Sequence, residues 1–156
     1  MKKSGLVALL SASLLLVSCG GTSYVNEKTN NGNVERDTLT LYSETFKLES
    51  YAKGSVEEGL ITGAYEYETY TRYEGKLEST DTENKYKLTY ETVATKVKVE
   101  GDGAFTYTKV NSYFYTALGY TEEEIDQIFE NKEVKKEIEL TSHVTVNPEN
   151  KTFALL

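Results

Sequence analysis

The single histidine, His143, is the residue on which any acid–base or nucleophilic chemistry would first depend. A catalytic triad needs an imidazole held against a Ser, Thr or Cys nucleophile. His143 lies in an alternating segment, residues 141–146, which is typical of a strand, and the chain has no Gly-x-Ser-x-Gly turn to present a nucleophile. We therefore predict that His143 is a strand residue on a polar face or at the rim of the core, and that the protein is not an enzyme.

Acidic side chains are the next candidates, because paired carboxylates can hydrolyse glycosides and oxygen clusters can bind calcium. The acidic pairs have simpler interpretations: Glu57-Glu58 as a solvated loop, Glu66 with Glu68 as a polar strand face, and residues 122–124 as the start of a helix. The run Asp81-Thr82-Glu83-Asn84 gathers oxygen ligands but lacks the glycine and distal glutamate of an EF-hand loop, so we predict a polar hairpin loop there. The glycines of Gly101-Asp102-Gly103 are not followed by the Lys-Ser/Thr pair of a phosphate-binding loop. We predict no metal and no cofactor.

Tyrosine is the one chemical feature that stands out, with 13 tyrosines and no tryptophan. Tyr65, Tyr67, Tyr70 and Tyr73 fall within nine residues. A tyrosine presents an apolar ring with a polar tip, which suits both recognition surfaces and the edge of a core. These four residues are the candidate ligand-binding residues, and packing in the core and its rim is the alternative.

Strands must position these tyrosines, because β-branched and aromatic residues alternate with polar ones from residue 38 onward. Residues 52–59 include glycines and are expected to form a loop. Tyr70 interrupts the alternation of its segment, which predicts a bulge near Thr69. A turn is expected at Gly101-Asp102-Gly103, and Phe105 and Tyr107 are expected to begin the next strand. The predicted strands are residues 38–43, 45–51, 60–74, 76–79, 85–91, 93–100, 137–146 and 151–155.

Helical signals occur late in the chain. Apolar residues over 111–118 follow helical spacing, with Asn111 as a possible cap and Gly119 at the carboxyl end, although an extended strand remains an alternative. The second signal is a capping box formed by Thr121 and Glu124, with Tyr120 and Ile125 placed for a hydrophobic staple. It predicts a helix that begins after Thr121.

Together these patterns predict a mainly β (α+β) fold in one domain, residues 38–156. We expect an antiparallel meander, either a small barrel or an open curved sheet, with one or two short helices near residues 111–136. The strand spacing and the Gly63-Ala64-Tyr65 motif are similar to bacterial lipocalin-like domains, but the family has Gly-x-Trp where this chain has Gly-x-Tyr.

The amino terminus has the layout of a secretory signal: Lys2 and Lys3, an apolar stretch of about 13 residues, and small residues before Cys19. The stretch is shorter than the roughly 20 residues that a membrane-spanning helix needs. Leu16-Val17-Ser18-Cys19 resembles the lipobox of bacterial lipoproteins. The resemblance implies removal of residues 1–18, a thioether-linked diacylglycerol on Cys19, and commonly a further acyl chain such as palmitate on its amino group. An ordinary secreted protein with a free Cys19 is the alternative.

Residues 19–37 are expected to form a lipidated flexible tether, because they show no periodic apolar face. The mature chain would carry 15 basic and 25 acidic residues, a net charge of −10, which argues against nucleic acid as a partner. We expect an extracytoplasmic lipoprotein held on a membrane through Cys19, at the outer face of the plasma membrane or, in an envelope with two membranes, in the periplasm or at the outer membrane. Its β domain would bind a protein, a peptide or a small apolar ligand; an envelope enzyme or its accessory subunit, or a structural envelope protein, are the alternatives.

Overall fold

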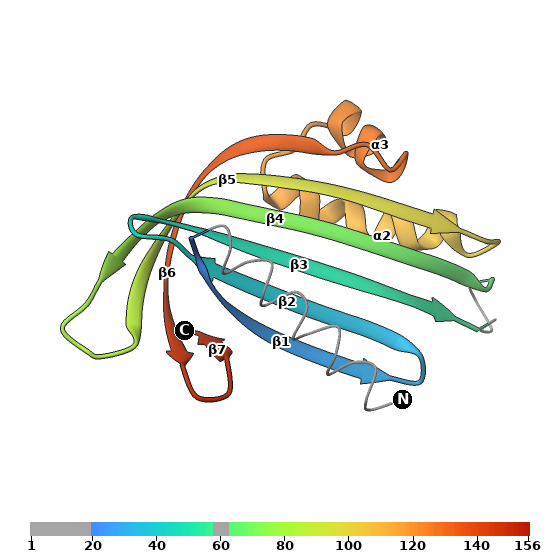
Figure 1. Ribbon diagram of the computed structural model, residues 1–156. Helices are drawn as coiled ribbons and strands as arrows, with labels where there is room; N and C mark the ends of the chain where they lie inside the picture. The colour runs from blue at the N-terminus through green and yellow to red at the C-terminus, as the bar shows by residue number, and fades with distance from the viewer. Residues whose placement is uncertain (1–19, 58–62) are drawn as a thin grey trace.

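The computed structural model describes residues 20–57 and 63–156. It confirms the mainly β fold: seven strands form one sheet in chain order, and every neighbouring pair is antiparallel (Figure 1). Two helices lie between the fifth and sixth strands in the sequence. The elements are β1 (Thr22–Asn30), β2 (Asn33–Leu41), β3 (Thr45–Val56), β4 (Tyr65–Ser79), β5 (Lys85–Glu100), α2 (Ala104–Ala117), α3 (Glu122–Phe129), β6 (Val134–Asn147) and β7 (Thr152–Leu155).

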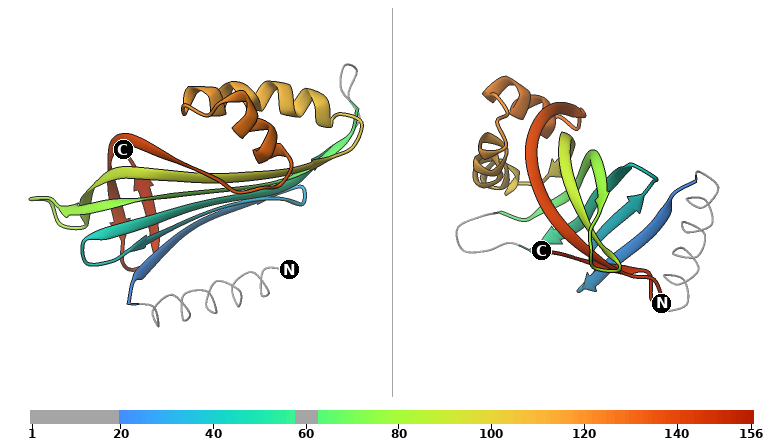
Figure 2. Two further views of the ribbon diagram at one scale, coloured as in Figure 1. Left: turned by 90° about the horizontal axis from the view of Figure 1, so that it is seen from above. Right: turned by 90° about the vertical axis from the view of Figure 1, so that its left-hand side faces the viewer.

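The sheet curls until its two edges nearly meet, so it is an almost closed barrel (Figure 2). The backbone N–H of Val25 on β1 donates to the carbonyl of Lys151 at 2.7 Å. The Asn26 side chain donates to the Phe153 carbonyl at 2.7 Å and accepts from the Phe153 N–H at 3.2 Å. Asn26 thus supplies, from a side chain, the pair of bonds that a neighbouring strand would supply from its backbone.

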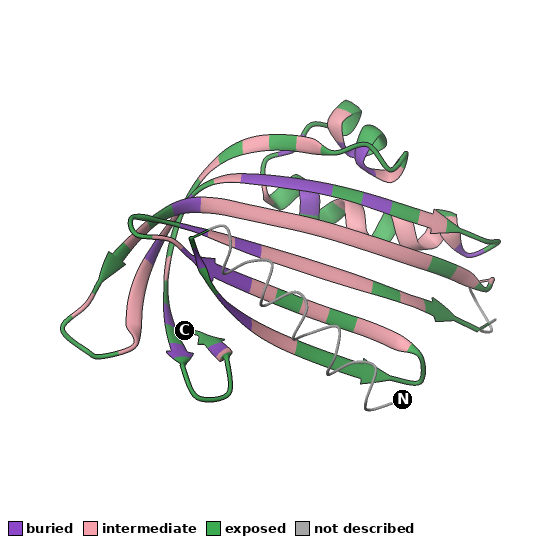
Figure 3. Cartoon of the chain, viewed as in Figure 1, coloured by how far each residue is buried: buried purple, intermediate pink, exposed green. Residues whose placement is uncertain are grey.

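Two hydrophobic clusters hold the domain together, one at each end of the inner face of the sheet. We call the end near Leu41 and Phe46 the closed end, where strands β1 to β7 wrap around a core that includes Leu39, Leu88 and Val144, all fully buried. At the opposite, open end, α2 and α3 cover the inner face and enclose a second cluster around Val93 and Val97. Figure 3 shows buried residues toward the closed end and along β5 beneath the helices.

A bulge on β5 allows one strand to serve both clusters. The register shifts at Glu91 against both neighbouring strands, between Tyr90 and Thr92. Leu88 and Tyr90 face inward before the shift, and Val93 and Val97 face inward after it. The inward-facing apolar residues are at even positions up to Tyr90 and at odd positions from Val93. Because Glu91 is an extra residue in the strand, both sets point to the same inner face. The bulge predicted near Thr69 is wrong, because β4 pairs without interruption from Glu66 to Glu74.

The flexible tether predicted for residues 19–37 is also wrong over its described part. Residues 22–41 form the β1–β2 hairpin, which turns at Asn31 and Gly32 with φ of 50° and 83°. Positive φ at both central residues is the requirement of a tight I′ hairpin turn, which Asn-Gly meets with little strain. The exposed residues of β1 are ordered by pairing with β2 and not by burial of their own side chains.

The strand predicted to begin at Phe105 is a helix, α2. It starts after Gly103, and Tyr107 and Tyr115 point from it into the second cluster. The polar side chains of its poor helix formers bond to carbonyls of the same helix. Thr108 donates to the Ala104 carbonyl at 2.9 Å, and Asn111 donates to the Tyr107 carbonyl at 2.8 Å. Asn111 is therefore an interior residue and not a cap, whereas Gly119, with φ of 93°, follows the helix end as predicted.

The remaining elements agree with the sequence patterns. Thr121 caps α3, accepting from the Glu124 N–H at 3.2 Å, and Tyr120 and Ile125 are both buried. β6 and β7 form the final hairpin, although β6 begins at Val134. β3 continues to Val56, through residues predicted to form a loop. The predicted strand segment 60–64 falls partly outside the described residues, as do the signal sequence and Cys19.

Candidate functional site

The four candidate tyrosines lie on two faces of the sheet. Tyr65 and Tyr67 point to the inner face of β4, where the Tyr107 ring lies 5.2 Å and 5.5 Å from theirs. Tyr73 is deeper on the same face, in edge contact with Tyr90 at 5.5 Å. Tyr70 is on the outer face, with its ring centroid 6.0 Å from the Lys96 ammonium nitrogen. The structure therefore does not unite the four in one patch.

The inner-face tyrosines join the helices to the sheet. Tyr67 stacks on Tyr107 of α2 with an interplanar angle of 14°. Burial raises the pKa of Tyr67, Tyr73 and Tyr107 above the ordinary tyrosine value. Their phenols are therefore neutral at physiological pH, and none is activated as a nucleophile. Packing explains the positions of Tyr73 and Tyr107 better than ligand contact does, whereas Tyr67 both packs on Tyr107 and lines a groove.

The outer face at the open end carries a different set of side chains, aligned in rows across the strands. Tyr51 and Tyr70 are direct neighbours in the β3–β4 register. The Tyr51 hydroxyl donates to a carboxylate oxygen of Glu68 at 3.2 Å, and the charge of Glu68, together with burial as the larger cause, raises the pKa of Tyr51. In the next row Lys53 pairs with Glu68, which pairs with Lys98 on β5. Half-buried tyrosines thus lie beside a row of alternating charge.

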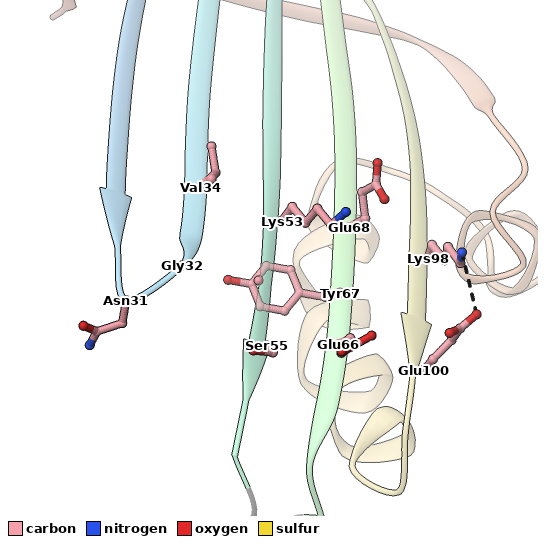
Figure 4. A pocket seen from close by; sticks show the side chains of 11 residues that line it. Asn31, Gly32, Val34, Lys53, Ser55, Glu66, Tyr67, Glu68, Lys98 and Glu100 are labelled. Atoms are coloured by element: carbon pink, nitrogen blue, oxygen red, sulfur yellow. Dashed lines mark ion pairs between the residues drawn. The ribbon is translucent and has the colours of Figure 1, made fainter. Parts of the chain in front are cut away.

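This row forms one wall of a groove of about 400 Å³ at the open end. Figure 4 shows its side chains coming from neighbouring strands, with Lys98 and Glu100 joined as an ion pair at 3.8 Å. Both partners of that pair are more than half exposed, so the pair contributes little stability and its charges remain available. The charged groups that line the groove are Lys53, Glu66, Glu68, Lys98 and Glu100.

A mixed-charge groove beside tyrosine rings is suited to recognition. Ammonium and carboxylate groups spaced along strands can pair with the backbone and charged side chains of a polar segment, and tyrosine adds contact area at low conformational cost. Among residues 20–57 and 63–156, no group of three or more His, Cys, Asp or Glu is placed to hold a metal ion. His143 is exposed on β6, where it pairs in register with Lys87, away from the groove.

Tyr67 is the candidate ligand-binding residue that lines the groove. The charged residues of the groove were missed from the sequence. Lys53 lies in the segment interpreted as a loop, yet alternation continues through it and could have placed it beside Glu68. The separation of Tyr70 from Tyr67 and Tyr73 follows from strand parity, because only odd-numbered positions of this part of β4 face inward. The predicted bulge near Thr69 would have turned Tyr70 toward the face of Tyr65 and Tyr67, and its absence leaves Tyr70 on the opposite face.

Comparison of the chain with protein-family models, curated proteins and solved structures gives no match. The structure of the site is therefore the only guide to its use. In the described part of the chain, neither helix has the length and apolar character needed to cross a bilayer.

Proposed function

We propose that this protein is an extracytoplasmic lipoprotein, held on a membrane by lipid on Cys19, whose β domain binds a segment of a partner protein at the outer-face groove. The groove carries the binding part of the proposal: two lysines and three glutamates line a concave surface next to Tyr51 and Tyr70. Charges of both signs on such a surface can give a bound peptide its specificity and register.

A small apolar ligand is a weaker alternative than a peptide. The inner face of the closed end is filled by its own side chains, including Phe46 and Leu88, and the inner face of the open end is covered by α2 and α3. Five charged groups line the groove beside Tyr67 and Val34, and an apolar ligand there would strip the charged groups of water without satisfying them. An enzymatic role has no activated group to support it in the groove.

The lipobox supports the anchor, and the domain begins immediately after it. Thr22 is already in β1, so only Gly20 and Gly21 separate Cys19 from the sheet. The three Cα–Cα steps from Cys19 to Thr22 span at most about 11 Å, which would hold the closed end of the domain close to the membrane surface. Lipid chains on one residue would make this attachment stable.

The anchor is tested by metabolic labelling with a palmitate analogue. We expect the wild-type protein to be labelled and to remain with the membranes, whereas Cys19→Ser is unlabelled and uncleaved by the lipoprotein peptidase. Labelling that persists in Cys19→Ser, or a wild-type protein released from membranes in unlabelled form, would refute the lipoprotein assignment.

The groove is tested with a photoreactive amino acid at position 98, compared with the same residue at position 87. Both lysines are on β5, with side chains 45% exposed for Lys87 and 55% for Lys98, and each is ion-paired with a glutamate, but Lys87 lies outside the groove. We expect a crosslinked adduct of one defined mass in intact cells from position 98, absent from position 87 and lost when Tyr70→Ala is added. Equal adducts from both positions would show that the groove has no special role.

A further inference from the structure

Two rows of side chains line the outer-face groove, and the rows differ in charge. The first, which we call the lysine row, consists of register neighbours on β3, β4 and β5: Lys53, Glu68 and Lys98. The second, the acidic row, consists of the next outward-facing residues on the same strands: Ser55, Glu66 and Glu100. Figure 4 shows the two rows side by side along the strands. The lysine row is positive on balance, and the acidic row is purely negative.

Each row holds a charge that the described residues leave unpaired. Among residues 20–57 and 63–156, neither Lys53 of the lysine row nor Glu66 of the acidic row forms an ion pair. Lys98 and Glu100 pair between the rows at 3.8 Å, but both side chains are more than half exposed, so their separation costs little free energy. Charges of opposite sign are therefore available on the two sides of the groove.

The acidic row contains a repulsion that a bound cation would relieve. Glu66 and Glu100 are direct neighbours in the β4–β5 register, and like charges in that position destabilise a sheet. Lys98 pairs with Glu100 and not with Glu66. A basic side chain placed over the acidic row could accept both carboxylates as hydrogen-bond partners, and charge-assisted bonds of this kind are the stronger ones.

The direction of the groove determines how a bound segment would meet the two rows. The groove crosses the strands, from Asn31 and Val34 beside β2 to Lys98 and Glu100 on β5. Successive side chains of an extended segment point to opposite sides. In a segment that lies along the groove with one backbone edge toward the sheet, neighbouring residues therefore face different rows, and residues two positions apart face the same row.

We propose that the groove binds an extended segment in which basic and acidic residues alternate, with its basic side chains over the acidic row and its acidic side chains over the lysine row. The inference rests on the proposed function, because it specifies the partner of that same site. A uniformly acidic segment would be repelled by Glu66 and Glu100, and a uniformly basic one by Lys53 and Lys98. The order of charges thus selects a partner by repulsion as well as by attraction.

Two synthetic peptides of equal composition test the order of charges. One has the core Lys-Glu-Lys-Glu between threonines, which places each sign on its own side of an extended chain. The other has the core Lys-Lys-Glu-Glu, which places both signs on each side. A photoreactive amino acid replaces Ser55, an uncharged residue of the groove, in the full-length protein in native membranes. Because exposed ion pairs are individually weak, we expect about a fivefold excess of adduct with the alternating peptide.

A pair of double variants shows whether the groove is the source of this preference. Lys53→Gln with Glu66→Gln removes one charge of each sign from the groove, so the net charge is unchanged, and the excess should fall below about twofold. Glu78→Gln with Lys87→Gln is the matched control, because it removes an ion pair between β4 and β5 outside the groove. The control should keep the excess, and the circular dichroism spectrum should be unchanged in both.

The outcomes separate this inference from the proposed function. Equal adducts of the two peptides, with the adduct in cells from position 98 still formed, would overturn the alternating order and leave the groove as a binding site. Equal capture of a peptide with the core Glu-Glu-Glu-Glu would assign an acidic partner instead. A preference that survived Lys53→Gln with Glu66→Gln would place its origin outside the groove and overturn the inference. A retained preference without any adduct in cells would refute the proposed function alone.

Discussion

Tyr120 connects α3 to the sheet through its hydroxyl group, and removal of that group should destabilise the domain measurably. The side chain is 4% exposed, and its hydroxyl lies 3.2 Å from the Val93 carbonyl and 3.0 Å from the Val134 carbonyl. Tyr120→Phe keeps the ring but leaves these buried acceptors without that donor. A hydrogen bond contributes about 1 kcal/mol net, and an unsatisfied buried group costs about 1–3 kcal/mol. We expect the free energy of unfolding to fall by about 1.5–2 kcal/mol.

The same hydroxyl makes the difference in unfolding free energy between wild type and Tyr120→Phe depend on pH. Burial, and secondarily the charge of Glu124, raises the pKa of Tyr120. The folded protein therefore keeps this proton at pH values where the unfolded chain releases it, near pH 10. This contribution to stability is complete below pH 10 and declines above it, by about 0.8 kcal/mol at pH 10.5. Phenylalanine has no proton to lose, so the stability difference between wild type and Tyr120→Phe should narrow by that amount.

Urea unfolding followed by circular dichroism at pH 7, 9 and 10.5 measures both effects. Tyr113→Phe is the control, since Tyr113 is 74% exposed and its change should stay within about 0.5 kcal/mol. If Tyr120→Phe were as stable as the control at pH 7, the hydroxyl would not anchor α3. If the difference between wild type and variant stayed constant up to pH 10.5, the argument from burial would be wrong.

Three further substitutions test the fold by thermal and chemical unfolding. Gly75→Ala should cost at least about 2 kcal/mol, because its Cβ would overlap the carbonyl oxygen of Thr89; a neutral result would contradict the close strand approach. Asn26→Ala should cost about 1–2 kcal/mol and speed hydrogen exchange at the Phe153 amide, and unchanged exchange would show that the barrel seam does not depend on this side chain. Leu88→Ala, at a fully buried site, should cost about 2–5 kcal/mol, and a loss below 1 kcal/mol would contradict the closed-end core.

The sequence predicted those elements whose signals are local. The capping box at Thr121 fixes the start of α3, and the loss of phase after Tyr90 anticipates the change of inward parity on β5. The Asn31-Gly32 turn carried an equally local signal, but the polar residues around it obscured the β1–β2 hairpin. Those residues are strand because β1 pairs with β2 across the turn and β2 pairs with β3, and pairing of this kind overrides the local preference of polar residues.

The site was less predictable than the fold, because it depends on which strands are adjacent and in what register. Lys53, Glu68 and Lys98 come from three strands and are aligned only by pairing. α2 was obscured for a related reason: large apolar residues lie on both its buried and its exposed sides, with polar residues between them, so its periodicity is weak.

The two lysines of the groove, Lys53 and Lys98, lead to a final prediction because they come from different strands, β3 and β5 (Figure 4). Since position 98 carries the photoreactive residue, the charge is reversed at Lys53. Lys53→Glu should abolish the crosslinked adduct, because it places a carboxylate where the partner would meet an ammonium group. The position is exposed, so the free energy of unfolding should stay within about 0.5 kcal/mol of the wild-type value. If Lys53→Glu kept the adduct at full yield, the groove would not recognise its partner by charge.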